Sequence, residues 1–168
     1  PTEESNIFDG IDTSWNRIQG GQEIGAILNK VQENFSFEDP SKSLPELLKA
    51  YQLIQDLQDK HWREIKTQQI KDIIYASSGL YLEAIADHAT VTPSEEVTVK
   101  LEAINRSSAQ VKLVSVELVP NNTKIEPAES LNNNSSWNEN LEFRLPENAD
   151  FTNPYWLKSE GSIGMYKV

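Results

Sequence analysis

The sequence predicts an α+β fold, with a helical first half and a β-rich second half. Between residues 22 and 87, apolar residues recur every three or four positions, which is the spacing of amphipathic helices. From Val97 onwards they alternate with polar residues, as in strands with one buried and one solvated face. Pro93 lies between the two patterns, where it stops a helix and favours an extended chain. We therefore expect a helical domain over residues 1–89 and a β domain over residues 90–168.

The helical half is predicted to contain three helices packed antiparallel. The first covers Gln22–Phe35 and carries its apolar residues on one stripe. An entry segment before it should be ordered, because Trp15 and Ile18 can dock onto this helix.

The second helix is predicted from a signal at its start, and the third from the point where the apolar pattern resumes. Ser43-Leu44-Pro45-Glu46 fits a capping box, in which Ser43 accepts from the Glu46 amide and the Glu46 side chain reaches back. The third helix should resume near Trp62 and continue to about Asp87, with Gly79 as a position where it can kink.

The β half is predicted to begin with a hairpin. Its strands are Val97–Asn105 and Val111–Val119, and the turn between them is Asn105–Gln110. The return strand is apolar at nearly every position, so we expect both of its faces to be covered.

A cleanly alternating strand is predicted over Trp137–Leu145. Slipping its register by one residue would bury its charged and amide side chains, so the register should be strongly specified. We therefore expect Trp137 to face Val99 and Leu101 of the first strand and to be buried.

Weaker strands are predicted at Lys124–Glu126 and Ile163–Val168. Strands at this spacing, with turns between them, are typical of an immunoglobulin-like β-sandwich. There are fewer of them than the usual number of about seven, so the sandwich should be incomplete in these residues. Either the helices cover its open face or the remaining strands lie beyond Val168.

Composition limits the classes of function. The net charge of −11 disfavours nucleic acid and anionic membranes as partners. The absence of Cys excludes disulfides and thiolate metal sites, and His61 and His88 are the only imidazoles. The chain starts at Pro1 without a Met and ends at Val168 within a predicted strand, so we expect it to be a piece of a longer protein.

Five blocks carry a resemblance to a known architecture: FDGIDTSWNRIQGGQEIG, LLKAYQLIQDLQDKHWREIK, GLYLEA, VKLEAINRS and NPYWLKSEGSIGMYKV. In this order they resemble the region behind the catalytic domain of long PIG-L (LmbE-like) deacetylases of Bacteroidetes-type bacteria. The resemblance implies a zinc-dependent parent enzyme that removes acetyl groups from N-acetylated amino sugars, in the periplasm or outside the cell.

The resemblance assigns no catalytic or metal-binding residue to this chain. The family's zinc ligands come from an Ala-His-Pro-Asp-Asp type motif and a distant His, and neither His61 nor His88 precedes Pro-Asp-Asp. We therefore expect no cofactor in these residues, with zinc in the catalytic domain of the parent.

The aromatic residues that could stack on sugar rings are Trp15, Trp62, Trp137, Tyr155 and Trp156. Trp62 and Trp137 lie on apolar stripes, so we assign them to the core. Tyr155 and Trp156 follow Pro154 in a loop-like setting and are the best candidates for contact with a carbohydrate.

Other candidate sites have ordinary explanations. His61 and Glu64 are neighbours on a helix, but two ligands do not make a zinc site, and a solvated helix face is the simpler interpretation. His88 is expected to cap the end of the third helix. The acidic residues Asp9, Asp12, Glu38 and Asp39 match no calcium loop. Five Asn residues begin N-x-S/T triplets and are interpreted as Asn in loops and helix ends: Asn34, Asn105, Asn121, Asn133 and Asn134.

These observations favour a non-catalytic accessory region that positions the parent's N-terminal catalytic domain or its substrate. A self-sufficient carbohydrate-binding module is the alternative, and a wall of the parent's active site is a third reading. A cluster of coplanar, exposed aromatic rings with polar neighbours would favour the binding module.

Overall fold

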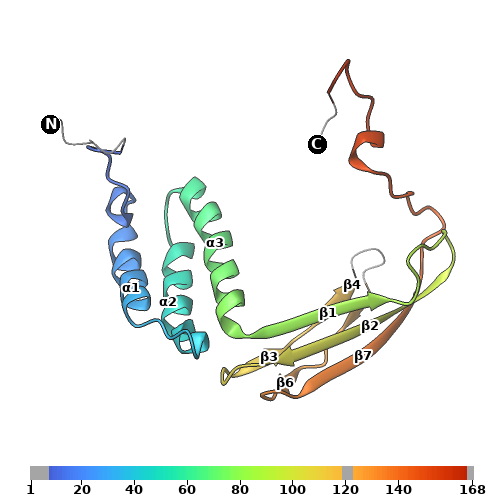
Figure 1. The fold of residues 1–168 in the computed structure, drawn as a ribbon, viewed down its shortest axis with the longest axis horizontal. Coiled ribbons are helices and arrows are strands. Elements are labelled where there is room, and N and C mark those ends of the chain that lie inside the picture. Colours follow the sequence, from blue (N-terminus) through green and yellow to red (C-terminus); the bar gives the residue numbers. More distant parts are fainter. Residues whose placement is uncertain (1–7, 119–122, 166–168) are drawn as a thin grey trace.

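Three α-helices are followed along the chain by antiparallel sheets, so the α+β class is confirmed. The computed structural model describes residues 8–118 and 123–165. The helices stand side by side at one end of the molecule, and the strands extend away from the end of the third helix (Figure 1). The helices are α1 (Gly21–Glu33), α2 (Leu44–Gln55) and α3 (Lys60–Ser78), with short 3₁₀ helices η1 (Trp15–Arg17), η2 (Pro40–Ser43) and η3 (Tyr155–Leu157). The strands are β1 (Leu80–Ala86), β2 (Glu96–Asn105), β3 (Val111–Leu113), β4 (Val116–Leu118), β5 (Thr123–Ile125), β6 (Glu129–Leu131) and β7 (Ser136–Arg144).

The helices enclose a closed apolar core. Its buried members are Ile18, Ile24, Leu47, Ala50, Ile54, Leu57 and Ile70. Trp15 packs against this cluster and Ile18 belongs to it, so the predicted docking of the entry segment is confirmed. Gly21 permits the contact, because a Cβ there would lie 2.3 Å from the carbonyl oxygen of Trp15.

The predicted capping box at the start of α2 is wrong. Ser43 has helical backbone angles (φ −79°, ψ −15°) and its side chain makes no capping hydrogen bond. The reason is that η2 runs directly into α2, whereas a capping residue needs an extended backbone. Glu46 instead contacts Lys30 and Lys49, each at 3.2 Å.

The predicted third helix is correct up to Ser78 and wrong beyond it. Gly79 adopts φ +67° and ends α3 in the left-handed conformation that glycine favours. Residues 80–86 then form β1, which pairs antiparallel with β2. The apolar residues of this stretch fit either period, and pairing with a neighbouring strand decides for β. The sheet therefore begins before the predicted boundary at residues 89 and 90.

The main sheet has the order β1-β2-β7, with both pairs antiparallel. Its buried apolar residues are Val97, Val99, Leu101, Ala103 and Leu141. The predicted strand Trp137–Leu145 is confirmed as β7, apart from its last residue. Trp137 packs against the cluster of Val97, Val99, Leu101 and Leu141, so the predicted parity is confirmed. Its direct partner is Ala103 and it is only half-buried, so the prediction that it is buried opposite Val99 and Leu101 is wrong in that part.

The predicted central hairpin is wrong. β3 pairs with β6 and β4 pairs with β5, so the stretch after residue 110 does not return onto β2. Asn105 explains the change of direction, since its Nδ2 donates to the carbonyls of Ala109 (2.7 Å) and Leu131 (3.1 Å). Val114 is exposed, so the stretch is not covered on both faces. Val119 lies outside the described residues.

The two weaker strand predictions have different outcomes. The short strand near Lys124–Glu126 is confirmed by β5. The last strand is not formed over residues 163–165, where a single bridge joins Ser162 and Met165 around a turn, and residues 166–168 lie outside the described part. None of the helices in the described ranges is long and apolar enough to cross a membrane.

A small polar junction connects the helices to the strands. The hydroxyl of Ser107 donates to the Ser78 carbonyl at 2.6 Å, and the Arg106 amide donates to the Gly79 carbonyl at 2.9 Å. The Asn105 side chain accepts from both the amide and the hydroxyl of Ser107, each at 3.0 Å. The loop after β2 is thus fixed against the end of α3.

Candidate functional site: the C-terminal arm

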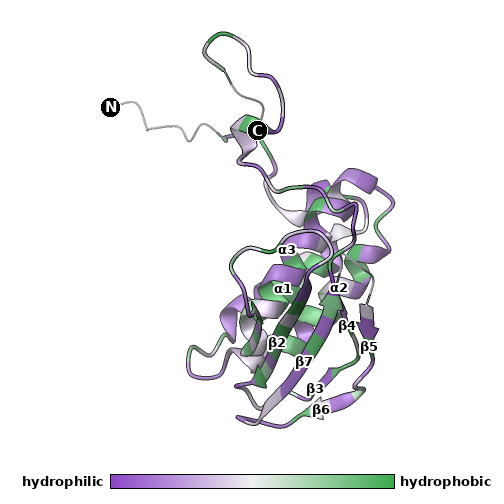
Figure 2. Ribbon diagram, turned by 90° about the vertical axis from the view of Figure 1, so that its right-hand side faces the viewer, coloured by the Kyte–Doolittle hydropathy of each residue, from purple (hydrophilic) through white to green (hydrophobic). Residues whose placement is uncertain are grey.

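The chain that follows β7 forms an exposed arm, here defined as residues 146–165. It leaves the end of the main sheet and runs away from the strands (Figure 1). Every residue from 150 to 165 is exposed. Green apolar segments interrupt it along its length (Figure 2). Its large apolar residues are Phe151, Tyr155, Trp156, Leu157, Ile163 and Met165. An exposed apolar run of this kind is a feature of surfaces that contact a partner.

The two residues singled out from the sequence, Tyr155 and Trp156, lie together in η3 of this arm. They are 49% and 47% exposed. Their ring centroids are 5.0 Å apart and their planes are inclined by 86°, so one ring presents its edge to the face of the other. Such a pair is stabilised by the quadrupoles of the two rings. It does not offer two coplanar faces to a sugar.

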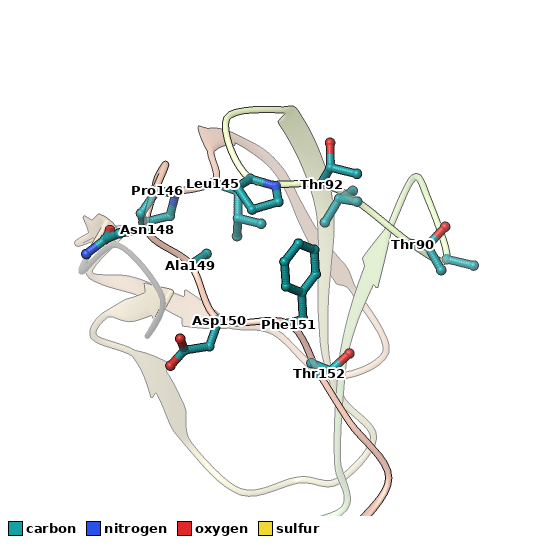
Figure 3. A pocket seen from close by; sticks show the side chains of 12 residues that line it. Thr90, Thr92, Leu145, Pro146, Asn148, Ala149, Asp150, Phe151 and Thr152 are labelled. Carbon is teal, nitrogen blue, oxygen red and sulfur yellow. The ribbon is translucent and has the colours of Figure 1, made fainter. Parts of the chain in front are cut away.

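A cavity of about 810 Å³ lies where the arm leaves the sheet. One wall is the loop of residues 89–93, which connects β1 to β2, and the other is the start of the arm. Figure 3 shows the ring of Phe151 pointing toward Thr92 and Leu145, with the Asp150 side chain directed away from it. The ring is nevertheless 76% exposed, so the cavity is open around it.

Hydrogen bonds fix the loop wall of this cavity. The Ser94 amide donates to the Leu145 carbonyl at 3.0 Å, and the Leu145 amide donates to the Glu95 carbonyl at 2.9 Å. The Glu95 carboxylate accepts from the Thr92 amide at 2.8 Å. Hydrogen bonds from the backbone and side chain of Thr92 hold the pKa of Glu95 below its usual value, against a smaller opposing effect of desolvation. The loop is therefore tied to the strand that precedes the arm.

The cavity is lined by hydroxyl, amide and apolar groups. Its polar side chains are those of Thr90, Thr92, Asn148, Asp150 and Thr152, and its lining includes no His, Lys, Arg or Ser. A second hollow of about 590 Å³ continues along the arm from Asp150 to Lys158. Hydroxyl and amide groups beside an aromatic ring can bind a polar ligand that has an apolar face.

Neither histidine lines the cavity at the base of the arm. His61 is exposed on α3 with its ring against Trp62 (centroids 5.4 Å apart), and Glu64 pairs with Lys60 at 3.7 Å. His88 follows β1 and pairs with Asp87 at 3.0 Å, so its predicted role as a helix cap is wrong, because the helix ends ten residues earlier at Ser78. Within residues 8–118 and 123–165, no group of three or more His, Asp or Glu side chains is placed to hold a metal ion.

The other aromatic candidates are structural. Trp15 and Trp62 pack against the helical core, and the guanidinium of Arg17 lies 4.7 Å from the ring centroid of Trp62. Trp137 packs against the core of the main sheet. Trp62 and Trp137 pack against the two cores as predicted, but both are only half-buried.

The remaining candidates make local bonds. Asp12 accepts from the amide and hydroxyl of Ser14, and Asp39 accepts from Ser41 at 2.5 Å. Asp9 and Glu38 are exposed. Asn105 is 1% exposed and both hydrogens of its amide are used, so this N-x-S triplet has a structural role.

Sequence reasoning missed Phe151 and the loop of residues 89–93. Phe151 stands alone in a polar stretch and belongs to no apolar period. The available signals were Pro146 and Pro154, which bracket a segment that cannot continue the sheet. They show a change of structure but do not identify a cavity.

Comparisons of the chain with models of protein families, with curated proteins and with solved structures gave no match. The resemblance to long PIG-L deacetylases therefore stays a prediction.

Proposed function

We propose that this chain is a non-catalytic accessory region whose C-terminal arm docks against the catalytic domain of its own longer protein. On the sequence resemblance, that domain is a PIG-L-like zinc-dependent deacetylase of N-acetylated amino sugars. The proposal includes an antiparallel packing of the three helices and an open, immunoglobulin-like arrangement of the strands. The helical core would then act as the rigid base, and the arm would be the surface that contacts the catalytic domain.

The perpendicular packing of Tyr155 and Trp156 is the observation that carries this proposal. Flat, coplanar rings would favour a platform for sugars, whereas an edge-to-face pair presents an irregular apolar surface. Leu157 extends this surface with a fully aliphatic side chain that is also exposed. A protein surface can cover all three side chains by shape, and aromatic residues dominate the energetics of such contacts.

A carbohydrate-binding module is the second candidate. It is favoured by the cavity at the base of the arm, where the ring of Phe151 stands among hydroxyl and amide groups (Figure 3). A single exposed ring can stack on one sugar unit while Asn148 or Thr152 bonds to its hydroxyls. In this case the ligand would bind to the isolated chain.

The two candidates can be separated by paired variants. In the full-length protein, we expect Tyr155→Ala combined with Trp156→Ala to loosen the arm, which limited proteolysis within residues 146–165 would detect. Phe37→Ala is the matched control, since Phe37 is a highly exposed aromatic residue of the helical half. In the isolated chain, calorimetric titration with N-acetylglucosamine oligomers should give no heat of binding.

Two results would contradict the accessory proposal. One is glycan binding by the isolated chain that Phe151→Ala abolishes while the chain stays folded, which would support the binding module. The other is release of acetate by the isolated chain in proportion to its concentration and in a chelator-sensitive manner.

A further inference from the structure

The first strand of the main sheet, β1, has an open edge. Within the described ranges it pairs with β2 on one side and with no strand on the other. Bonds at its two ends show which amides face β2: the Asp87 amide donates to the Thr98 carbonyl at 3.0 Å, and the Gly79 carbonyl accepts from Arg106 at 2.9 Å. In an antiparallel ladder, hydrogen-bonded pairs alternate with non-bonded pairs.

It follows that the backbone groups of Leu82, Ala84 and Ala86 point to the open edge, because these positions alternate with the bonded ones. All three residues are exposed. Their partners across the ladder are Ala103, Leu101 and Val99, so their side chains share the face that carries the buried core of the sheet. An added strand could therefore bond to this edge and extend the same apolar face.

An apolar groove lies directly beside this edge. Its volume is about 310 Å³, and it is lined by residues 82–84 of β1, residues 101–103 of β2, Trp137, and residues Leu113, Ser115 and Val116 from the chain that crosses the face. Leu82 is 51% exposed at its rim. Side chains at alternate positions of an added strand would enter this groove.

The opposite face of the edge carries acidic charge. Glu83 lies directly across from Glu102, and like charges at paired positions destabilise a sheet. None of the ion pairs in the described part of the chain includes either carboxylate. Lys100, opposite Ile85, lies on the same face, and the Arg106 guanidinium lies 4.5 Å from the Tyr81 ring, but neither is paired with Glu83 or Glu102 in the described part of the chain. The Tyr81 hydroxyl donates a hydrogen bond to Glu83, which leaves the charge of the carboxylate in place. A basic residue of an added strand, placed beside Glu83, would relieve this repulsion.

A second copy of the chain is a poor occupant of the edge. Antiparallel pairing over the full length of β1 places Glu83 beside Glu83, with Glu102 next to each, and parallel pairing in register does the same. A charge at the centre of an edge strand is a common protection against self-association. The net charge of −11 adds to the repulsion between copies.

We propose that β1 is a docking edge for an extended segment of a partner protein in which apolar and basic residues alternate. Main-chain bonds to residues 82, 84 and 86 give affinity, the groove selects the apolar side chains, and Glu83 with Glu102 selects the basic ones. This surface is separate from the C-terminal arm and does not depend on the function proposed for it.

The test uses a capped peptide of the same length as β1, 7 residues, that alternates lysine and valine. It is titrated into the isotope-labelled chain at low ionic strength and followed by amide chemical shifts. We expect the shifts to be concentrated on Leu82, Ala84 and Ala86. A peptide of the same composition with the alternation scrambled should bind at least about tenfold more weakly, since it can use only its charge.

Two variants test the mechanism. Ala84→Pro removes an amide that points to the open edge without touching a bond to β2, so it should weaken binding about tenfold or more, whereas Ala84→Val should not. Glu83→Lys should reverse the preference toward a peptide that alternates glutamate and valine. If Ala84→Pro does not fold, a lysine–valine peptide N-methylated at the valines tests the same bonds on the native chain.

Several outcomes would overturn the proposal. They are no binding of the alternating peptide, equal binding of the scrambled peptide, and binding unaffected by both Ala84→Pro and N-methylation. Self-association of the chain alone that Ala84→Pro abolishes would assign the edge to a second copy and would also overturn it.

Discussion

The helical half and the β half fill their interiors differently. The three helices surround seven buried apolar residues, and half-buried neighbours close the cluster. The main sheet buries five such residues on one face, and the short strand pairs β3–β6 and β4–β5 leave an apolar groove beside β1 open. The exposed arm also belongs to the β half. The helical half therefore has a closed core, whereas the β half leaves part of its apolar surface open.

The largest expected effect is the difference in stability lost when an apolar side chain is truncated in the helical half or in the β half. Leu47 is 1% exposed in the helical core, so Leu47→Ala should lower the free energy of unfolding by about 2–5 kcal/mol. Leu82 lies at the rim of the groove and is already half exposed. Leu82→Ala should therefore lower the free energy of unfolding by about 0.5 kcal/mol or less. Denaturant titration of both variants measures this. Equal costs would remove the distinction between a closed and an open half.

The buried side chain of Asn105 should be the most sensitive point of the link between the halves. Asn105→Ala leaves the carbonyls of Ala109 and Leu131 and the Ser107 amide without this partner. A buried polar group left unsatisfied costs about 1–3 kcal/mol, so we expect a loss of at least that size. The loss should be seen in both halves if they unfold together. A change confined to the amides of the strands would show that the halves unfold independently.

Two helix starts provide a smaller, paired test. The Asp59 side chain accepts from the Trp62 amide at 3.1 Å, so Asp59→Ala should lower the free energy of unfolding by about 0.5–2 kcal/mol. Ser43→Ala should cost less, because Ser43 makes no such bond. Thermal melts of the two variants give the comparison. A larger loss of stability for Ser43→Ala than for Asp59→Ala would contradict this and would indicate that Ser43 does cap α2.

The smallest effect concerns pH and the loop wall of the cavity. The pKa of Glu95 is lowered by its hydrogen bonds from Thr92, so the contribution of this contact is fully present above the ordinary value of 4.5. It is lost as the pH falls below that value and through the lowered pKa. The protection factor of the Thr92 amide, which is its exchange rate corrected for the intrinsic effect of pH, should therefore fall in acid, and Glu95→Gln should show the lower protection already at neutral pH. A protection factor at Thr92 that does not change with pH in the native chain would contradict this.

The elements that could be predicted from the sequence are those in which one period dominates. The helices before residue 79 and the strands β2 and β7 carry long, unambiguous patterns, so their existence and buried faces were predictable. β1 could not be separated from a continuation of α3 by periodicity, because its apolar residues fit both periods. The left-handed Gly79 and the pairing with β2 decide for a strand.

The pairing of the short strands could not be predicted for a different reason. Adjacent strands usually form hairpins, and the stretch after Asn105 fits that expectation in composition. The actual pairing depends on bonds from one buried amide to carbonyls 4 and 26 residues away. Sequence spacing does not reveal such bonds. In the candidate site, Tyr155 and Trp156 were found as aromatic residues outside any period, but their perpendicular packing is a property of the structure alone.

Hydrogen exchange, measured residue by residue on the isolated chain and on the full-length protein, tests the division of roles most directly. We predict slow exchange in α1, α2 and α3 in both samples, because the closed core protects them. The amides of Phe151 to Leu157 should exchange rapidly in the isolated chain. In the full-length protein they should become protected, because the proposed function has a catalytic domain cover them. Protection of the arm in the isolated chain, or its continued rapid exchange in the full-length protein, would contradict the account.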